Sequence, residues 1–407
     1  MHKFCNGEQQ EHTVAQPAIG LLPSSYRKSA ILFCLATFFF WASLYLFVPV
    51  LPVYAQTLGA SLSMVGVVIA SYALPQIITR IPMGVWFDTL DRRKPMVAAG
   101  IIIAALGALG LGLAPTTWFL ALARAITGIG ASCWVIFTVY FASYYPGERM
   151  GRAIGLINFV NSAAVVTATS CGGIAADVWG FSPIFFIAAT LGIISLAALL
   201  AAKEPERKQL QSVSLSWKGF RQAATHPLLL TVSGMGIVNH YASYAGIFGF
   251  IPIYASDIGA SKTELGLLTM ITIASAGVAS LFASHLAERH GSRFVVILGA
   301  ALLGGALLAV PFLNKVYMLE MVQVFNGLGW GTLNTILMIL AIRAVAPQQR
   351  ATAMGVYQAI YAIGMMLGPL LSGFLADNLS LSLAFYLAAF LCVIVAAMAF
   401  LPVLAKR

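Results

Sequence analysis

The segment LPVYAQTLGAS at residues 51–61 returns later in the chain as IPIYASDIGAS at residues 251–261. Both copies have the form of a turn followed by the start of a helix. Solenoid repeats recur roughly every 20 to 50 residues, so a single recurrence at half the chain length excludes a solenoid. The 407-residue chain is therefore predicted to consist of two related halves.

The composition indicates what kind of halves these are. Hydrophobic residues make up 60% of the chain and charged residues only 9%, and the mean hydropathy is +0.90. A water-soluble domain could not bury so much apolar surface, so the solvent of these side chains is lipid. Runs of about 20 apolar residues span a bilayer as a helix, and the alternating pattern of outer-membrane strands is absent. The sequence predicts an all-α membrane protein.

We expect twelve transmembrane helices joined by short connectors. The predicted spans are residues 29–52, 63–87, 95–114, 117–142, 153–176, 182–202, 228–252, 264–287, 294–313, 316–342, 352–376 and 382–403. A mixed-charge cytoplasmic linker, residues 203–227, separates a six-helix bundle over 29–202 from a second bundle over 228–403. Polar tails at 1–28 and 404–407 complete the predicted organisation, and the first tail lacks the order of a cleaved signal peptide.

Lysine and arginine set the predicted orientation, because they accumulate in loops on the cytoplasmic side. With the amino terminus inside, nineteen of the 23 basic residues fall in cytoplasmic segments. The exceptions are Lys262 and Lys315 in external loops and Arg80 and Arg124 within spans. Both termini are therefore expected in the cytoplasm, with the protein in the cell membrane. The net charge of +10 is a topology signal, which argues against nucleic-acid binding, and the five cysteines lack C-x-x-C spacing, so no metal site is indicated.

The duplication continues along the chain at an offset of 200 residues. Matching residues recur in the pairs Pro52 and Pro252, Tyr54 and Tyr254, Gly66 and Gly266, Asp88 and Glu288, Gly173 and Gly373, and Asp177 and Asp377. Because six is an even number of helices, both halves enter the membrane in the same direction, related by an axis along the membrane normal. Parallel halves of this kind hold a binding site at their interface near mid-membrane and rock against each other.

Between the second and third predicted spans the chain reads GVWFDTLDRRK, residues 84–94. This loop resembles the G-x-x-x-D-x-x-G-R-R motif of the major facilitator superfamily, with Leu90 and Asp91 in place of the usual residues before the arginine pair. The resemblance extends over residues 29–403 and implies alternating access by two six-helix halves. It also implies that Asp88, Arg92 and Arg93 latch the halves when the outside is open. The alternative is a loop that only directs membrane topology.

Two arginines inside predicted spans are candidate functional residues. Arg124 begins RAITGIGAS, residues 124–132, which resembles the R-x-x-q-G-x-g-a motif of the same family. It lies roughly 10 Å into the membrane, too deep for free snorkelling to water. Arg80 shares a helix face with Gly84 and Asp88. The alternative for Arg124 is a structural role in tying helices together through backbone carbonyls. For Arg80, gate stabilisation and substrate contact are both open.

His240 lies near the middle of the predicted span 228–252. An imidazole titrates near neutral pH and can carry a proton between the two sides. His240 is therefore a candidate for proton coupling, together with the Asp88 cluster. A histidine that is simply hydrogen-bonded in a helix contact is the alternative. The family resemblance places helices 1, 4, 7 and 10 around the cavity.

Polar and aromatic side chains outline a cavity wall. Asn158 and Asn161 lie one turn apart on a helix face, and Gln358 and Tyr361 keep that spacing in the second half. Each side chain could instead form hydrogen bonds between helices, worth only about 0.6 kcal/mol on average. The full set of predicted cavity residues is Trp41, Tyr45, Asn158, Asn161, Asn239, Tyr244, Gln323, Asn326, Gln358 and Tyr361.

Sequence features of the fifth and eleventh spans bear on the substrate. Antiporters of the family resemble one another in a G-P-x-x-G-G run in helix 5. Here ATSCGG, residues 168–173, keeps only the Gly-Gly, and GPLLSG, residues 368–373, lies in the other half. This departure weakens the case for drug–proton antiport. Two buried arginines without an obvious buried acid favour a neutral or anionic organic solute.

The chain has no G-x-x-x-x-G-K-[ST] phosphate loop and no hydrolase signature, so we expect neither ATP hydrolysis nor another enzyme activity, and no cofactor. Transport must use a gradient or run downhill, with protons as the favoured coupling ion. We expect a monomeric secondary transporter of a small organic solute in a lipid bilayer, and the family resemblance favours export. The alternatives are a proton-coupled uptake symporter, a multidrug/proton antiporter and, in a different class, a lipid flippase.

Overall fold

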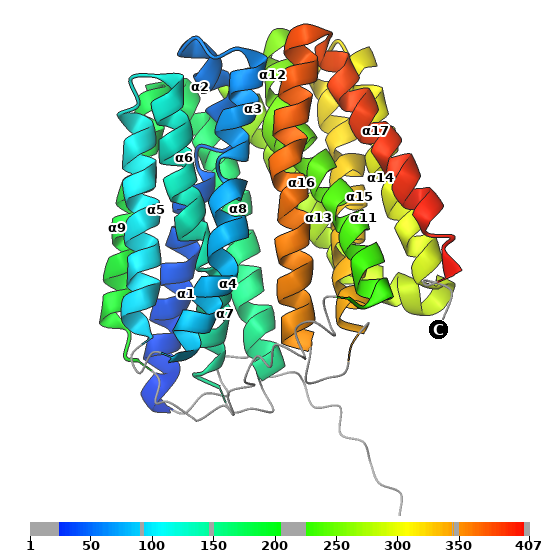
Figure 1. The fold of residues 1–407 in the computed structure, drawn as a ribbon. Helices are drawn as coiled ribbons and strands as arrows, with labels where there is room; N and C mark the ends of the chain where they lie inside the picture. The colour runs from blue at the N-terminus through cyan, green and yellow to red at the C-terminus, as the bar shows by residue number, and fades with distance from the viewer. Residues whose placement is uncertain are drawn as a thin grey trace, which may run out of the picture.

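The computed structural model describes residues 24–89, 93–145, 150–204, 225–343, 345 and 350–402. These residues form helices joined by short turns and include no strand. Figure 1 shows long helices running side by side between two ends of the molecule. The short helices α2 (Leu51–Thr57) and α12 (Ile251–Asp257) lie at one end, which we name the upper end. Helix α1 (Ser24–Tyr45) begins at the opposite, lower end.

The helices form the two pseudo-symmetric halves that the sequence predicts. The first half continues with α3 (Leu62–Ala70), α4 (Ala73–Thr89), α5 (Lys94–Gly112), α6 (Thr117–Ser132), α7 (Trp134–Ala142), α8 (Met150–Trp179) and α9 (Phe181–Ala201). The second half contains α11 (Pro227–Ala245), the π-helix η3 (Gly246–Phe250), α12, α13 (Lys262–His290), α14 (Ser292–Ala309), the 3-10 helix η4 (Val310–Phe312), α15 (Val316–Arg343), α16 (Arg350–Asn378) and α17 (Leu381–Met398). The halves meet where α8 packs against α13 and where α3 and α4 pack against α16.

The repeated segment of the sequence forms the same turn at the upper end of both halves. Gly59 and Gly259 have φ angles of 82° and 92°, a left-handed conformation that glycine adopts without steric cost. The hydroxyl oxygens of Ser61 and Ser261 each accept the backbone N–H three residues later and so cap α3 and α13. The duplicated segment therefore encodes a helix end, a glycine turn and a capped helix start.

Several predicted spans are interrupted. Eleven helices among the described residues are long and apolar enough to cross a membrane. The predicted span 228–252 is not a continuous α-helix, because α11 gives way to the π-helix η3. A Cβ on Gly249 would lie 2.6 Å from the carbonyl oxygen of Tyr244, so glycine permits this wide turn. Three first-half spans, predicted at 29–52, 63–87 and 117–142, are each divided into two helices.

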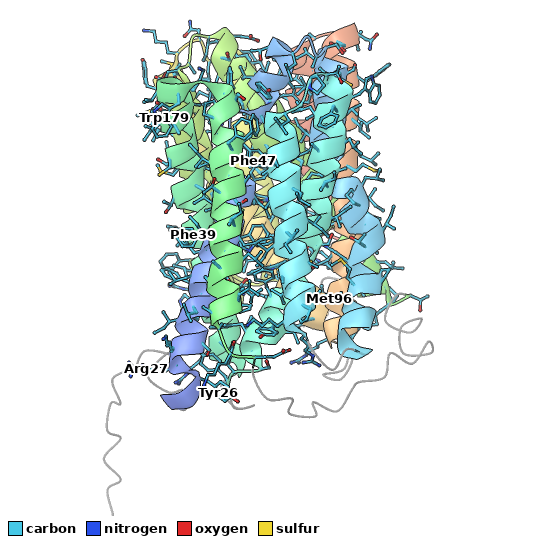
Figure 2. The ribbon with its side chains drawn as sticks, turned by 90° about the vertical axis from the view of Figure 1, so that its left-hand side faces the viewer. Tyr26, Arg27, Phe39, Phe47, Met96 and Trp179 are labelled. Carbon is cyan, nitrogen blue, oxygen red and sulfur yellow. The ribbon has the colours of Figure 1, made fainter. Side chains whose placement is uncertain are left out.

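Large apolar side chains cover the outside of the bundle. Leu281, Phe159 and Trp118 are 75%, 70% and 70% exposed, which suits contact with lipid tails and would be unfavourable in water. Figure 2 shows Trp179 towards the upper end and Tyr26 and Arg27 at the lower end. Aromatic and basic side chains favour these two depths, where a membrane meets water.

Candidate functional site

A carboxylate joins the two halves at the upper end. Asp377, in the last turn of α16, accepts the backbone N–H groups of Leu62 and Ser63, both at 2.8 Å. These are the first residues of α3, whose N–H groups have no partner inside the helix. The partial positive charge of a helix N-terminus also favours an anion at this position. The end of a second-half helix thereby holds the beginning of a first-half helix.

The pseudo-symmetric counterpart of this contact joins α8 to α13. Asp177, in the last turn of α8, accepts the backbone N–H groups of Lys262 at 3.1 Å and Thr263 at 2.7 Å. It also accepts the hydroxyl of Thr263. The ammonium of Lys262 donates to the carbonyl of Ala176 at 3.1 Å. The position of Lys262 in the other contact is taken by Leu62, so only the Asp177 contact includes a cation.

Below these carboxylates the helix backbones touch. A Cβ built on Gly266 would lie 3.0 Å from the Cα of Gly173, and one built on Gly66 would lie 3.4 Å from the Cα of Gly373. Such close approach needs small residues on both helices. Together, the two capped helix starts and the two glycine contacts close the upper end of the interface between the halves.

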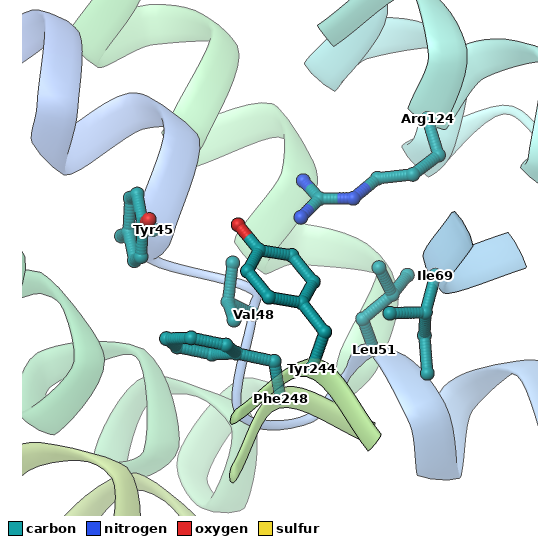
Figure 3. Close-up of a pocket in the computed structure, with 7 residues that line it drawn as sticks. All are labelled: Tyr45, Val48, Leu51, Ile69, Arg124, Tyr244 and Phe248. Atoms are coloured by element: carbon teal, nitrogen blue, oxygen red, sulfur yellow. The ribbon is translucent and has the colours of Figure 1, made fainter. Parts of the chain in front are cut away.

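A small cavity lies between the halves. Its volume is about 10 Å³, which is barely enough for one water molecule. The first half contributes Tyr45, Val48, Leu51, Ile69 and Arg124, and the second half contributes Tyr244 and Phe248. Figure 3 shows the hydroxyl of Tyr244 pointing toward the guanidinium of Arg124. Both halves therefore supply polar groups to one enclosed space.

Arg124 is held mainly by aromatic rings. Its guanidinium carbon lies 4.2 Å from the centre of the Tyr72 ring and 5.3 Å from that of Phe47. Stacking on ring faces is a favourable setting for a guanidinium away from water. Its Nη1 donates to the Thr127 hydroxyl at 3.4 Å, and the side chain is only 5% exposed. These contacts include no carboxylate, so the positive charge is not neutralised by an ion pair among the described residues.

Arg80 and His240 both contact Tyr361 of the second half. Arg80, on α4, donates to Gln76 at 2.5 Å and to the Tyr361 hydroxyl, on α16, at 3.4 Å. The ring of His240, on α11, stacks on Tyr361 with 3.8 Å between centroids and an angle of 4°. The Nδ1 of His240 donates to the carbonyl of Gly236 at 3.0 Å. The structure thus brings three predicted residues, Arg80, His240 and Tyr361, into one cluster.

Two predicted residues lie inside the second half. The Gln323 side-chain oxygen accepts from the Thr272 hydroxyl and from the Asn326 amide, both at 3.0 Å. Gln323 is the structural counterpart of Arg124. Gly128, four residues after Arg124, packs against the carbonyl of Tyr72, and Gly327, four residues after Gln323, packs in the same way against the carbonyl of Thr272. The offset between the halves is 199 residues at this point. The neutral Gln323 therefore replaces the charge of Arg124.

The four remaining predicted cavity residues, all with amide side chains, differ in burial and in hydrogen bonding. Asn239 is fully buried, and neither its amide nitrogen nor its amide oxygen has a hydrogen-bond partner. Asn158 is exposed and donates to the Ile154 carbonyl of its own helix at 2.8 Å. Asn161 and Gln358 are half-buried. The structure does not join these four amides into one cluster.

Two segments of the chain, residues 33–240 and 234–407, match the family model of the Major Facilitator Superfamily. The chain belongs to this superfamily. Its members are carriers, so the protein is an integral membrane transporter and does not act as an enzyme.

Similar proteins span nearly the whole chain. The uncharacterized MFS-type transporter MJ1560 of Methanocaldococcus jannaschii is 24% identical over 370 residues, which cover 87% of this chain and 93% of that protein. Multidrug resistance protein 1 of Bacillus subtilis is 26% identical over 354 residues, covering 84% and 88%. The crystal structure of a bacterial homologue of the human lysosomal transporter Spinster shares the fold, with a TM-score of 0.81 at 17% identity, covering 97% of this chain and 99% of that one.

The loop motif of the superfamily falls partly outside the described residues, which exclude Arg92 and the side chain of Asp88. The described part shows a contact within the first half. The backbone N–H groups of Arg93 and Lys94 donate to one carboxylate oxygen of Glu204, at 2.6 and 3.1 Å. Glu204 thereby caps α5 at the lower end. The latch role predicted for Asp88, Arg92 and Arg93 stays a prediction.

Sequence reasoning named Trp41 and Tyr45 as cavity residues but missed the row of aromatic rings across the interface to which they belong. Trp134 lies 5.2 Å from Trp41, which lies 5.7 Å from Tyr45. Tyr45 lies 6.3 Å from Phe248 of the second half, and Phe248 lies 6.0 Å from Trp330. The rings come from four different helical segments, so no single periodicity marks them.

Sequence reasoning also gave no role to Asp177 and Asp377, or to Gln76 as the partner of Arg80. The sequence contains a signal for the aspartate pair and another for Gln76. The two aspartates recur at an offset of 200 near the ends of predicted spans, and Gln76 precedes Arg80 by one helical turn.

Proposed function

We propose that this transporter carries a small organic solute, with anionic or neutral solutes favoured over cations, by alternating access coupled to protons. The observation that carries the proposal is the charge of the space between the halves. Arg80 and Arg124 lie there, whereas none of the 13 acidic residues of the chain lies near the middle of a predicted span. A buried cation without a carboxylate partner favours an anion that supplies the missing charge.

Alternating access explains why the upper contacts join different halves. The hydrogen bonds of Asp177 and Asp377 cross the interface, so opening of the upper end must break both sets. We assign the upper end to the outside, because the two loops that follow α4 and α9 at the other end contain seven lysines and arginines. The protein would then lie in the cell membrane with both termini in the cytoplasm and act as a monomer.

Proton coupling is assigned to His240. Its ring is 6% exposed and stacks on Tyr361, which also accepts a hydrogen bond from Arg80. A change in the charge of His240 would therefore alter the electrostatic environment of the hydrogen bond between Arg80 and Tyr361, which joins the two halves. Export is favoured over uptake because several relatives are named as multidrug resistance proteins.

Those names also support a second candidate, a multidrug/proton antiporter. A carboxylate in the cavity would favour the binding of lipophilic cations, whereas the buried charges here, Arg80 and Arg124, are positive. The two candidates therefore predict opposite substrate charges.

A liposome assay tests the proposal. The purified protein is reconstituted with an internal pH dye, and pools of anionic, neutral and cationic solutes are added to the outside. A proton signal with anions that is lost in Arg124→Ala supports the proposal. A signal seen only with lipophilic cations overturns it in favour of the multidrug antiporter.

A further inference from the structure

Within the proposed function, on which this inference rests, we propose that the substrate is an aromatic carboxylate: a planar ring that carries one carboxylate group. The inference combines two features of the space between the halves. One is a set of four hydrogen-bond donors without partners, and the other is the row of aromatic rings that crosses the interface.

Four of the buried donors without partners belong to groups that cannot accept a hydrogen bond. The Nε atoms of Arg80 and Arg124 and the indole Nε1 atoms of Trp41 and Trp330 are all buried and have no hydrogen-bond partner. Arginine and indole N–H groups only donate, so these four atoms cannot satisfy one another. A buried donor without a partner is costly, at about 1–3 kcal/mol. A ligand that supplies acceptors would remove this cost, and a carboxylate supplies two oxygens with about four acceptor sites.

The two arginines determine the charge of that ligand. Arg124 lines the cavity at 5% exposure, and Arg80 is half-buried beside Tyr361. Their contacts among the described residues are aromatic rings, hydroxyls and one amide, and include no carboxylate. A guanidinium binds a carboxylate through two parallel hydrogen bonds, which a neutral ligand cannot reproduce.

The row of rings determines the body of the ligand. Tyr45 and Phe248 line the cavity from opposite halves, and Trp41 and Trp330 continue the row on either side. The ring planes of Tyr45 and Phe248 meet at 76° and those of Phe248 and Trp330 at 84°, so ring faces are presented in several directions. A flat aromatic ring can stack on such faces or meet their edges, each worth about 0.5–1.5 kcal/mol beyond the area buried.

The cavity must widen to admit this ligand. Its present volume of about 10 Å³ is far below the roughly 300 Å³ or more of a small-molecule pocket. Tyr244 and Phe248 belong to the second half and Arg124 and Tyr45 to the first, so separation of the halves enlarges the space. An aromatic carboxylate would then contact both halves, with its charge on first-half arginines and its ring against residues of both.

A matched series of solutes tests the inference on the unaltered protein. The purified protein is titrated by calorimetry with benzoate, with cyclohexanecarboxylate as the anion without an aromatic ring, and with benzyl alcohol and benzylamine as the neutral and cationic rings. We expect benzoate to bind about tenfold more tightly than each of the others. Counterflow of radiolabelled benzoate into proteoliposomes, corrected for uptake by protein-free vesicles, then shows whether the bound compound is carried.

Variants locate the site. We expect Arg124→Gln and Arg80→Gln to weaken benzoate binding about tenfold. Trp41→Phe keeps a ring and loses the donor, whereas Trp41→Leu loses both, so binding should weaken more in the second. Arg343→Gln removes a positive charge from the exposed end of α15 and serves as the control that keeps wild-type binding. Size-exclusion profiles check that each variant is folded.

The outcomes separate the inference from the proposed function. Equal binding of cyclohexanecarboxylate and benzoate overturns the aromatic part. Tighter binding of benzylamine or benzyl alcohol overturns the anionic part, even if every variant fails to fold. Transport of some other solute without binding of benzoate overturns the substrate class alone. No movement of any solute in the liposome screen overturns the proposed function as well.

Discussion

Asp377 accepts the backbone N–H of Ser63 at 2.8 Å, and this hydrogen bond joins the end of α16 to the beginning of α3 in the other half. Asp177 forms the equivalent bond to Thr263 at 2.7 Å. Each carboxylate replaces the missing partner of a helix N-terminus, so the bonds exist only while the halves are together at this end. The pair therefore contributes free energy to the closed state of the upper end.

We expect Asp377→Asn to weaken that closed state, because the amide keeps the shape of the side chain and loses its negative charge. A helix cap contributes about 1 kcal/mol, so the ratio of closed to open molecules should fall about fivefold. Spin labels at Thr116 and Lys315, which are exposed at the upper ends of the two halves, would report the separation by double electron–electron resonance in a cysteine-free background.

The control for this experiment is Asp257→Asn, an acid-to-amide change at an exposed position of the same end. It should leave the distance distribution unchanged. If the double variant Asp177→Asn, Asp377→Asn also keeps the short distance, the carboxylates do not hold the halves together.

Gly266→Ala is expected to hinder closure by steric contact. The new Cβ would lie 2.7 Å from the Thr169 carbonyl oxygen and 3.0 Å from the Cα of Gly173, and neither backbone atom can move aside cheaply. The same pair of spin labels should show a longer distance, and transport should fall. Gly277→Ala is the matched control, because it adds the same methyl group to α13 where no atom lies within 4 Å. Equal distances in the two variants would show that the glycine contact is not required for closure.

Prediction from sequence succeeded where a feature repeats along the chain. The copies at residues 51–61 and 251–261 predicted the two halves, and the hydropathy predicted the helices, because both depend on residues adjacent in the sequence. Prediction failed where a partner is a backbone group or comes from a distant helix. The partners of Asp377 are N–H groups of α3, and the ring of Phe248 meets Tyr45 of the other half.

The comparison of the halves also shows why a fixed offset misplaces some residues. Lys94 donates to the Leu200 carbonyl at the lower end of the first half, and Arg293 donates to that of Ala399 in the second. These equivalent cations are 199 residues apart, whereas Asp177 and Asp377 are 200 residues apart. A constant offset of 200 instead pairs Arg93 with Arg293.

We expect Tyr361→Phe to have a smaller effect than Arg80→Gln. The hydroxyl of Tyr361 accepts from Arg80 at 3.4 Å, a long hydrogen bond, and Phe preserves the stacked ring on His240. Transport by Tyr361→Phe should fall about threefold, whereas Arg80→Gln removes a charge and should lose about tenfold or more. Initial rates in proteoliposomes provide the comparison. A larger loss in Tyr361→Phe would mean that the hydroxyl itself acts in transport, for example on a proton held by His240.

Asn239→Leu is expected to stabilise the protein and to impair its transport. Asn239 is fully buried on α11, and both polar atoms of its amide are without a hydrogen-bond partner, which costs about 1–3 kcal/mol relative to an apolar side chain of similar shape. Leucine removes that cost, so the melting temperature of the purified protein should rise by a few degrees. A group kept at such a cost is typical of a functional position, and transport should therefore fall. Ser233→Ala, another buried polar residue of α11 without a partner, tests whether stabilisation alone slows the cycle. If Asn239→Leu melts at a higher temperature and transports at the wild-type rate, Asn239 has no part in the transport cycle.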